Sequence, residues 1–264
     1  MSIYDSRALL IYCCFVALVV GAVFGSFLNC AAWRIAHGRS FLKGRSICPN
    51  CGHVLGAADL VPIFSWLIQK GRCRWCGVRI SIRYPLTELA FAMITLLCLL
   101  RFDLTVLALR NWIFLACLFC LSLVDLEACI IPDGCLLTAL AAYVLALPFL
   151  WQGWAELARA VLAGLVFGGG LLGLSLLMDK LLKKDSLGGG DIKLFAVIGL
   201  YLGFVGTLFT LLLSCVAGLL LGLLLRRGEG GKPIPFGPAI SLAAAFVLLY
   251  GDGMINWYLG LLGL

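Results

Sequence analysis

Gly188-Gly189-Gly190-Asp191-Ile192-Lys193-Leu194 opens a long apolar run, Leu194 to Leu225, in which no residue is charged. The run is long enough for two helices, and we expect a hinge near Gly203-Phe204-Val205-Gly206. Asp191 therefore lies at the edge of a predicted bilayer, where an ionised carboxylate is costly and is often functional. On this stretch alone, a solvated acid on a flexible cytosolic turn explains the pattern equally well.

The composition of the whole chain also indicates a membrane protein. The 264 residues are 63% hydrophobic and only 12% charged, which is too apolar for a soluble domain. We see no cleavable signal peptide, because residues 8–33 are uncharged and longer than a signal-peptide core. The sequence predicts an all-α polytopic membrane protein with about eight transmembrane helices. They are expected at residues 8–33, 84–100, 111–124, 135–151 and 160–178, twice within 194–225, and at 239–250.

The basic residues gather in particular loops. Residues 34–83 contain nine Lys and Arg residues against a single acid, Asp59. The positive-inside rule makes this segment cytosolic and puts the N-terminus outside. The same rule makes the loop at 179–193 cytosolic, so Asp125 and Asp191 are both expected at the cytosolic face. The net charge of +7 follows from this topology, and we expect no nucleic-acid partner.

Four cysteines of the basic segment form two pairs, Cys48-Pro49-Asn50-Cys51 and Cys73-Arg74-Trp75-Cys76, each followed by glycine. Two such pairs, 21 residues apart, match the spacing of a four-thiolate zinc site. Two redox CxxC motifs are the alternative, and a reducing cytosol argues against them. The sequence thus predicts a small cytosolic zinc-binding insertion between the first two helices. The chain divides into a first transmembrane helix (1–33), this segment (34–83) and a membrane-embedded domain (84–264).

A second acid, Asp125, ends the apolar run at 111–124 as Asp191 begins the run at 194–225. Two carboxylates that can share a proton are the minimal equipment of an aspartyl protease. Two further polar residues lie in apolar runs. Asn29 needs a partner in lipid, and a helix-packing face is the simpler interpretation. Glu88 is either functional or pairs with a loop arginine and only holds its helix in place.

Several short motifs occur in a characteristic order around the cysteine tetrad and the two acids. They are Gly25-Ser26-Phe27-Leu28-Asn29, Asp59-Leu60-Val61-Pro62, Tyr84-Pro85-Leu86-Thr87-Glu88, Asp125 to Ile131-Pro132-Asp133, Gly188-Gly189-Gly190-Asp191-Ile192-Lys193 and Pro235-Phe236-Gly237-Pro238. With these motifs in this order, the chain resembles the bacterial type IV prepilin leader peptidases over nearly its whole length. That family consists of bifunctional peptidase and N-methyltransferase enzymes, and the stretch at Asp191 is similar to its GxGD motif.

The resemblance implies an aspartic endopeptidase in which Asp125 and Asp191 are the catalytic pair. The supporting residues it implies around this pair are Gly188, Gly190, Lys193, Asp133 and Glu127. Lys193 either biases the local field or is only a positive-inside anchor. The cysteine tetrad Cys48, Cys51, Cys73 and Cys76 corresponds to that of the family, with a structural Zn²⁺.

The resemblance also implies the substrates and the location. They are prepilins or pseudopilins with a short basic leader, cut at the cytosolic face of the bacterial inner membrane, with membrane lipid around the enzyme. A second reaction follows, methylation of the new N-terminus with S-adenosylmethionine. The sequence contains no recognisable nucleotide-binding fingerprint, so Asn29 and Glu88 are candidates for methyl transfer only by their nearness to the membrane surface. The alternatives are a peptidase without methyltransferase activity and a non-enzymatic zinc-bearing membrane scaffold.

Overall fold

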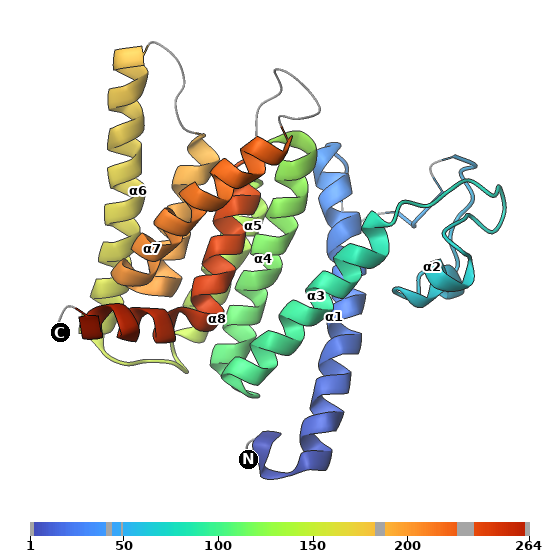
Figure 1. Ribbon diagram of the computed structural model, residues 1–264, viewed down its shortest axis with the longest axis horizontal. Coiled ribbons are helices and arrows are strands. Elements are labelled where there is room, and N and C mark those ends of the chain that lie inside the picture. The colour runs from blue at the N-terminus through green and yellow to red at the C-terminus, as the bar shows by residue number, and fades with distance from the viewer. Residues whose placement is uncertain (1–2, 41–43, 49, 183–187, 226–234, 262–264) are drawn as a thin grey trace. The chain divides into compact units, whose positions relative to one another are not determined.

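The computed structural model describes residues 3–40, 44–48, 50–182, 188–225 and 235–261. The middle of the predicted basic loop at 179–193, residues 183–187, lies outside these residues. The described chain is helical (Figure 1). Its helices are η1 (Ile3–Asp5), α1 (Arg7–Ala36), η2 (Ala57–Asp59), α2 (Phe64–Ile68), α3 (Arg83–Phe102), α4 (Val106–Ala128), α5 (Asp133–Ala146), α6 (Trp154–Leu182), α7 (Gly189–Leu225) and α8 (Gly237–Leu261).

These helices confirm the prediction of an all-α membrane protein that crosses the bilayer several times. Among the described residues, five helices are long and apolar enough to cross a membrane, namely α1, α3, α4, α6 and α7. Two shorter apolar helices are α5 and the Gly237–Gly253 part of α8. Each segment that the sequence predicts as a transmembrane helix thus contains a helix, but the one predicted at 135–151 ends at Ala146. The total of eight spans stays a prediction.

The chain forms two compact units, Met1–Trp112 and Ile113–Leu264. In the first unit, α1 packs along α3 through glycines one helical turn apart. A Cβ added at Gly21 would lie 2.6 Å from Cα of Ala92, and one added at Gly25 would lie 2.9 Å from Cα of Glu88. Helices in lipid associate through such small residues because the two backbones can approach closely. The packing role expected for this end of the first helix is therefore supported.

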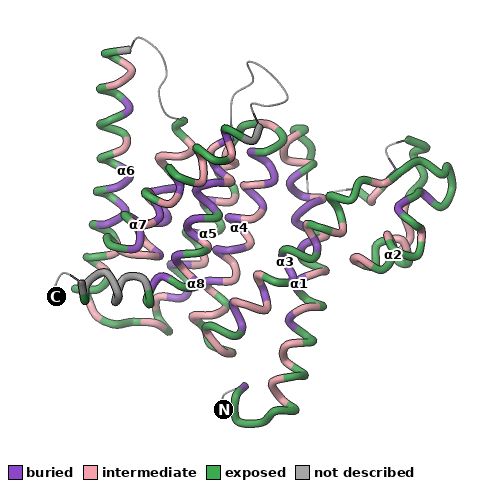
Figure 2. The backbone as a smooth tube through the Cα atoms, in the orientation of Figure 1, coloured by how far each residue is buried: buried purple, intermediate pink, exposed green. Residues whose placement is uncertain are grey.

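In the second unit, α6 and α7 also pack closely through small residues. Gly164 and Gly168 of α6 face Ala196 and Gly199 of α7, and a Cβ added at Gly164 would lie 2.7 Å from the Ala196 carbonyl oxygen. In the core of this unit the Phe114 and Tyr201 rings stack 3.9 Å apart. The Tyr201 hydroxyl donates to the Ala139 carbonyl at 2.7 Å, which ties α7 to α5. Figure 2 shows buried residues concentrated on the facing sides of these helices.

The expected hinge within the long apolar run is confirmed. α7 is interrupted at Gly203, whose φ of 66° and ψ of −173° are not helical. A positive φ costs glycine little, because it has no side chain. The Thr207 hydroxyl donates to the Gly203 carbonyl at 2.6 Å, so this carbonyl is satisfied within the apolar run.

The close approach of α6 and α7 predicts a stability effect. Gly164→Leu should lower the midpoint of thermal unfolding in detergent, because overpacking against a backbone costs about 1–3 kcal/mol. Gly169→Leu is the matched control on the same helix, since a Cβ there would meet nothing within 4 Å. An equal effect of the two substitutions would contradict the packing described here.

Candidate functional site

Asp125 lies in the last turn of α4 and is 5% exposed. The sequence pattern ended this helix at residue 124, and the structure continues it to Ala128. The Asp125 Oδ2 atom accepts a hydrogen bond from the backbone N–H of Gly237 at 2.8 Å. Gly237 is the first residue of α8, and the first N–H groups of a helix have no partner inside it. The acid therefore caps the N-terminus of a helix that is 112 residues away in sequence.

Gly237 is needed for this contact. A Cβ added at Gly237 would lie 2.8 Å from the Asp125 Oδ2 atom, so a larger residue would push the carboxylate away from the N–H group. Sequence reasoning included Gly237 only as part of the late Pro235-Phe236-Gly237-Pro238 turn. The one local sequence feature that indicates a helix start at Gly237 is the proline directly after it, because proline is favoured near helix starts.

Asp191 lies in the first turn of α7, one residue after Gly190. Its backbone N–H donates to the Gly188 carbonyl at 3.0 Å, which turns the chain into the helix. Gly190, directly before Asp191, packs on Ile131 of the α4–α5 connection, so Asp191 and Asp125 lie at the same end of the second unit. The described residues offer no hydrogen-bond partner for the Asp191 side chain, and none for Oδ1 of Asp125.

A side chain larger than that of glycine would be crowded at two positions before Asp191, by a different neighbour in each case. A Cβ added at Gly190 would lie 2.8 Å from Cβ of Ile131, so the α4–α5 connection packs directly on the start of α7. A Cβ added at Gly188 would lie 3.1 Å from Oδ2 of Asp191. Gly188 thus leaves space beside the acid, whereas Gly190 lets the α4–α5 connection approach the helix start.

Lys193 and Asp133 form an ion pair with an Nζ–Oδ1 distance of 2.8 Å. The side chains are 59% and 64% exposed, so the pair contributes little stability. It nevertheless joins the first turn of α7 to the first residue of α5. Glu127 lies in the last turn of α4 and is exposed. The N-terminal ends of α5, α7 and α8 thus gather at the C-terminal end of α4, and the partial positive charge of helix N-termini favours carboxylates there.

Asn29 and Glu88 lie on α1 and α3 of the first unit, and both are buried. Glu88 accepts a hydrogen bond from the backbone N–H of Ile63 at 2.7 Å, and it also hydrogen-bonds Ser26 of α1. A backbone amide of the insertion thus takes the place expected for an arginine. The Asn29 Nδ2 atom is buried and has no hydrogen-bond partner among the described residues.

The four cysteines of the insertion come together in the first unit. Their sulfur atoms all lie within 4.8 Å of one another, and the Sγ atoms of Cys48 and Cys76 are 3.8 Å apart. Zinc–sulfur bonds of about 2.3 Å at tetrahedral angles would put sulfurs ~3.8 Å apart. Cys48 and Cys73 are buried, whereas Cys51 and Cys76 are exposed.

The two cysteine pairs have the same backbone fold. The N–H of Gly52 donates to the Cys48 carbonyl, and the N–H of Gly77 donates to the Cys73 carbonyl, both at 2.9 Å. The two glycines have φ of 70° and 71°. This turn directs backbone N–H groups at the sulfurs. The hydrogen bond from the Val78 N–H has the largest effect of several that lower the pKa of the Cys76 thiol to about 6, and thiolates are the form that binds metal.

The fold and these two sites define a helical multi-pass membrane protein with a pair of acids at helix ends and a four-cysteine cluster. Comparison with known families identifies it further. Residues 19–102 match the bacterial peptidase A24 N-terminal domain, and residues 112–223 match the type IV leader peptidase family. The chain belongs to the type IV leader peptidase family.

Curated relatives agree with this family. The chain is similar to the prepilin leader peptidase/N-methyltransferase of Aeromonas salmonicida (strain A449), with 35% identity over 81% of this chain and 74% of the relative. It is 34% identical to the protein of the same name from Bacillus subtilis (strain 168), over 92% of this chain and 97% of the relative. The protein of that name from Pseudomonas aeruginosa is 36% identical over 83% and 76% of the two chains. No solved structure matches the chain.

Proposed function

We propose that this chain is a prepilin leader peptidase that also methylates the N-terminus it exposes. The reaction is an aspartic endopeptidase cleavage of the basic leader from prepilins or pseudopilins. The observation that carries the proposal is the placement of Asp125 and Asp191 at the same end of the second unit, in a chain of this family. The location is the bacterial inner membrane, with the N-terminus outside and both acids at the cytosolic face.

Asp125 and Asp191 hold one proton between them during catalysis, because two like charges so close together are unfavourable. The ionised carboxylate takes a proton from a water molecule, which attacks the scissile carbonyl. The protonated carboxyl donates a hydrogen bond to the developing oxyanion. The N–H of Gly237 holds Oδ2 of Asp125 in place, which leaves Oδ1 to face the water.

The surrounding residues have positioning roles in this proposal. Gly188 leaves room for an extended peptide beside Asp191, and Gly190 supports the acid by letting Ile131 pack on the start of α7. The ion pair between Lys193 and Asp133 holds the first turn of α7 against the start of α5. Glu127 contributes a polar surface at the same end of α4.

The cysteine cluster is a structural Zn²⁺ site with Cys48, Cys51, Cys73 and Cys76 as ligands. The four sulfurs complete a tetrahedral shell, so no position is left for substrate. What supports this assignment is the sulfur spacing and the two matched turns. The exposed His53 ring stacks on Trp75 at 3.7 Å instead of joining the sulfurs.

The methyl-transfer site lies at Asn29 and Glu88. S-adenosylmethionine supplies the methyl group of this reaction. The free Nδ2 donor of Asn29 suits a carboxylate, and the Glu88 carboxylate suits an amine, so the pair fits an amino-acid moiety. Glu88 also anchors Ile63, which has an unfavourable φ of 63°.

The methyl-transfer assignment predicts a split between the two activities. Glu88→Gln keeps an oxygen that can accept from the Ile63 N–H but removes the charge. We expect methylation to fall roughly 10- to 100-fold, the value of a hydrogen bond to a charged group, while leader cleavage is retained. Transfer of a labelled methyl group to a pre-cleaved pilin measures the first activity, and a gel shift measures the second. Unchanged methylation in Glu88→Gln and in Asn29→Ala would exclude these residues.

The function as a whole is tested by incubating membranes that contain the chain with a candidate prepilin. The expected result is removal of the leader and a methylated new N-terminus, both seen by mass spectrometry. A cleaved but unmethylated pilin would favour the peptidase-only alternative. An uncut prepilin, with the protein inserted and its metal bound, would favour a zinc-bearing scaffold.

A further inference from the structure

One solvent-exposed side of the insertion between α1 and α3 is apolar, although the insertion is otherwise rich in charged residues. The apolar side chains concerned are exposed by 43% to 76%. They are Leu60, Val61, Phe64, Leu67 and Ile68, called here the α2 surface.

The side chains of α2 are arranged with the apolar ones outward. Phe64, Leu67 and Ile68 are three and four residues apart and so share one face of the helix. Trp66 points the other way, where its indole N–H donates to the Ile80 carbonyl at 3.1 Å. A Cβ added at Gly71 would lie 2.9 Å from the Trp66 ring. The helix is therefore held to the insertion by Trp66, while its larger apolar face is left outside.

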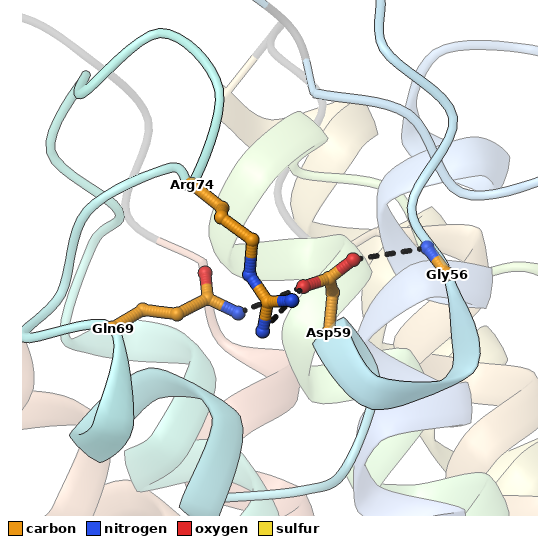
Figure 3. A network of polar contacts seen from close by, with 4 residues as sticks. All are labelled: Gly56, Asp59, Gln69 and Arg74. Carbon is orange, nitrogen blue, oxygen red and sulfur yellow. Dashed lines mark hydrogen bonds and ion pairs between the residues drawn. The ribbon is translucent and has the colours of Figure 1, made fainter.

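The only acid of the insertion is used internally. Asp59 accepts hydrogen bonds from the backbone N–H of Gly56 at 3.1 Å and from Gln69 at 3.0 Å, and it pairs with Arg74 at 3.3 Å (Figure 3). Its side chain is 5% exposed. The outward charge of the insertion is therefore positive, with eight Lys and Arg residues besides Arg74 between positions 34 and 83.

We propose that the α2 surface docks on the anionic phospholipid of the membrane that α1 and α3 cross. Both ends of the insertion continue into apolar helices, at Ala36 and at Arg83, so it is tethered to the bilayer surface. A five-residue helix is too short to span, but its apolar side chains can enter the interface. Basic residues around an apolar surface are the combination that anionic headgroups attract. A basic prepilin leader would be repelled by the same charge.

The first test uses the full-length protein in nanodiscs without substrate. The photoreactive residue p-benzoylphenylalanine replaces Phe64, or Val54 as the control. Val54 is also apolar and 40% exposed, but it lies on the first cysteine turn. On irradiation we expect lipid adducts at position 64 at several times the yield at position 54. The yield should rise when phosphatidylglycerol is added to phosphatidylcholine. Equal yields at both positions, or no response to phosphatidylglycerol, would overturn the proposal.

Introducing opposite charges at Ile68 distinguishes bound lipid from other occupants of the α2 surface. Ile68 is 76% exposed, so Ile68→Lys and Ile68→Glu should both fold, which bound zinc confirms. With the photoreactive residue at position 64, we expect Ile68→Lys to give at least about fivefold more lipid adduct than Ile68→Glu in anionic nanodiscs. The reverse order, with adducts to added prepilin, would assign the surface to the leader. Adducts to a second copy of the chain would assign it to a dimer contact.

Discussion

Asp125→Asn and Asp191→Asn should each reduce prepilin cleavage by roughly 10²–10⁴-fold, the usual contribution of a general acid or base. Asparagine has nearly the same shape as aspartate, and its side-chain oxygen can still accept the Gly237 N–H, so the fold should survive. It can neither take a proton from water nor share one with the remaining carboxylate. Cleavage of a prepilin in membranes, followed over time at matched protein levels, measures the loss.

The control for this prediction is Glu156→Gln. Glu156 is acidic and belongs to the same unit, but it lies in the first turn of α6 and its pair with Arg159 is exposed, so we expect cleavage close to that of the unchanged protein. Normal cleavage by either Asp125→Asn or Asp191→Asn, in a protein that still inserts, would remove that residue from the catalytic pair. A large loss in Glu156→Gln would instead show that the loss is not specific to the pair.

Replacing Cys48 and Cys51 together with serine should remove the bound zinc and unfold the insertion. Structural zinc supplies about 10–16 kcal/mol in small zinc-binding peptides, and Cys48 and Cys73 are the only buried apolar side chains among the described residues of 37–82. We expect the metal content of the purified protein to fall from about one zinc per chain to near zero. Residues 37–82 should also become sensitive to protease.

The second unit has its own buried core, so the same variant should still cut prepilin. Methylation should fall, because Ile63 of the insertion is the partner of Glu88. Cys215→Ser is the control, since Cys215 is exposed and lies outside the cluster. Unchanged zinc content in the double variant, or an equal loss in Cys215→Ser, would contradict the metal assignment.

The features that depend on local sequence were predictable. Uninterrupted apolar runs located the helices, and paired cysteines with matched glycines located the cluster. Gly203 could be expected to break α7, because glycine alone tolerates its backbone conformation. The end of α4 was misplaced by one turn because a charged residue, Asp125, was taken as the end of the helix. In the structure this acid is held inside the helix by a long-range hydrogen bond.

The features that depend on contacts between distant segments were not predictable. No periodicity links Gly237 to Asp125, since 112 residues separate them. The same holds for Gly164 against Ala196 and for Glu88 against the Ile63 amide. Whether the apolar stretch at 60–67 packs on the cysteine module or lies in the membrane interface could not be decided from the sequence for another reason. Its sequence reads as an ordinary apolar stretch, and only the direction of Trp66 shows which side faces the insertion.

The hydrogen bond at Gly237 makes the two acids unequal in an alanine scan. Truncating Asp191 removes a side chain that accepts no hydrogen bond from the described residues, so lost turnover would measure chemistry alone. Truncating Asp125 also leaves the first amide of α8 without its acceptor, at a cost of about 1–3 kcal/mol. Part of its lost turnover would then reflect misfolded enzyme. Comparing uncorrected rates would overestimate the catalytic contribution of Asp125 unless expression and melting temperature are measured alongside.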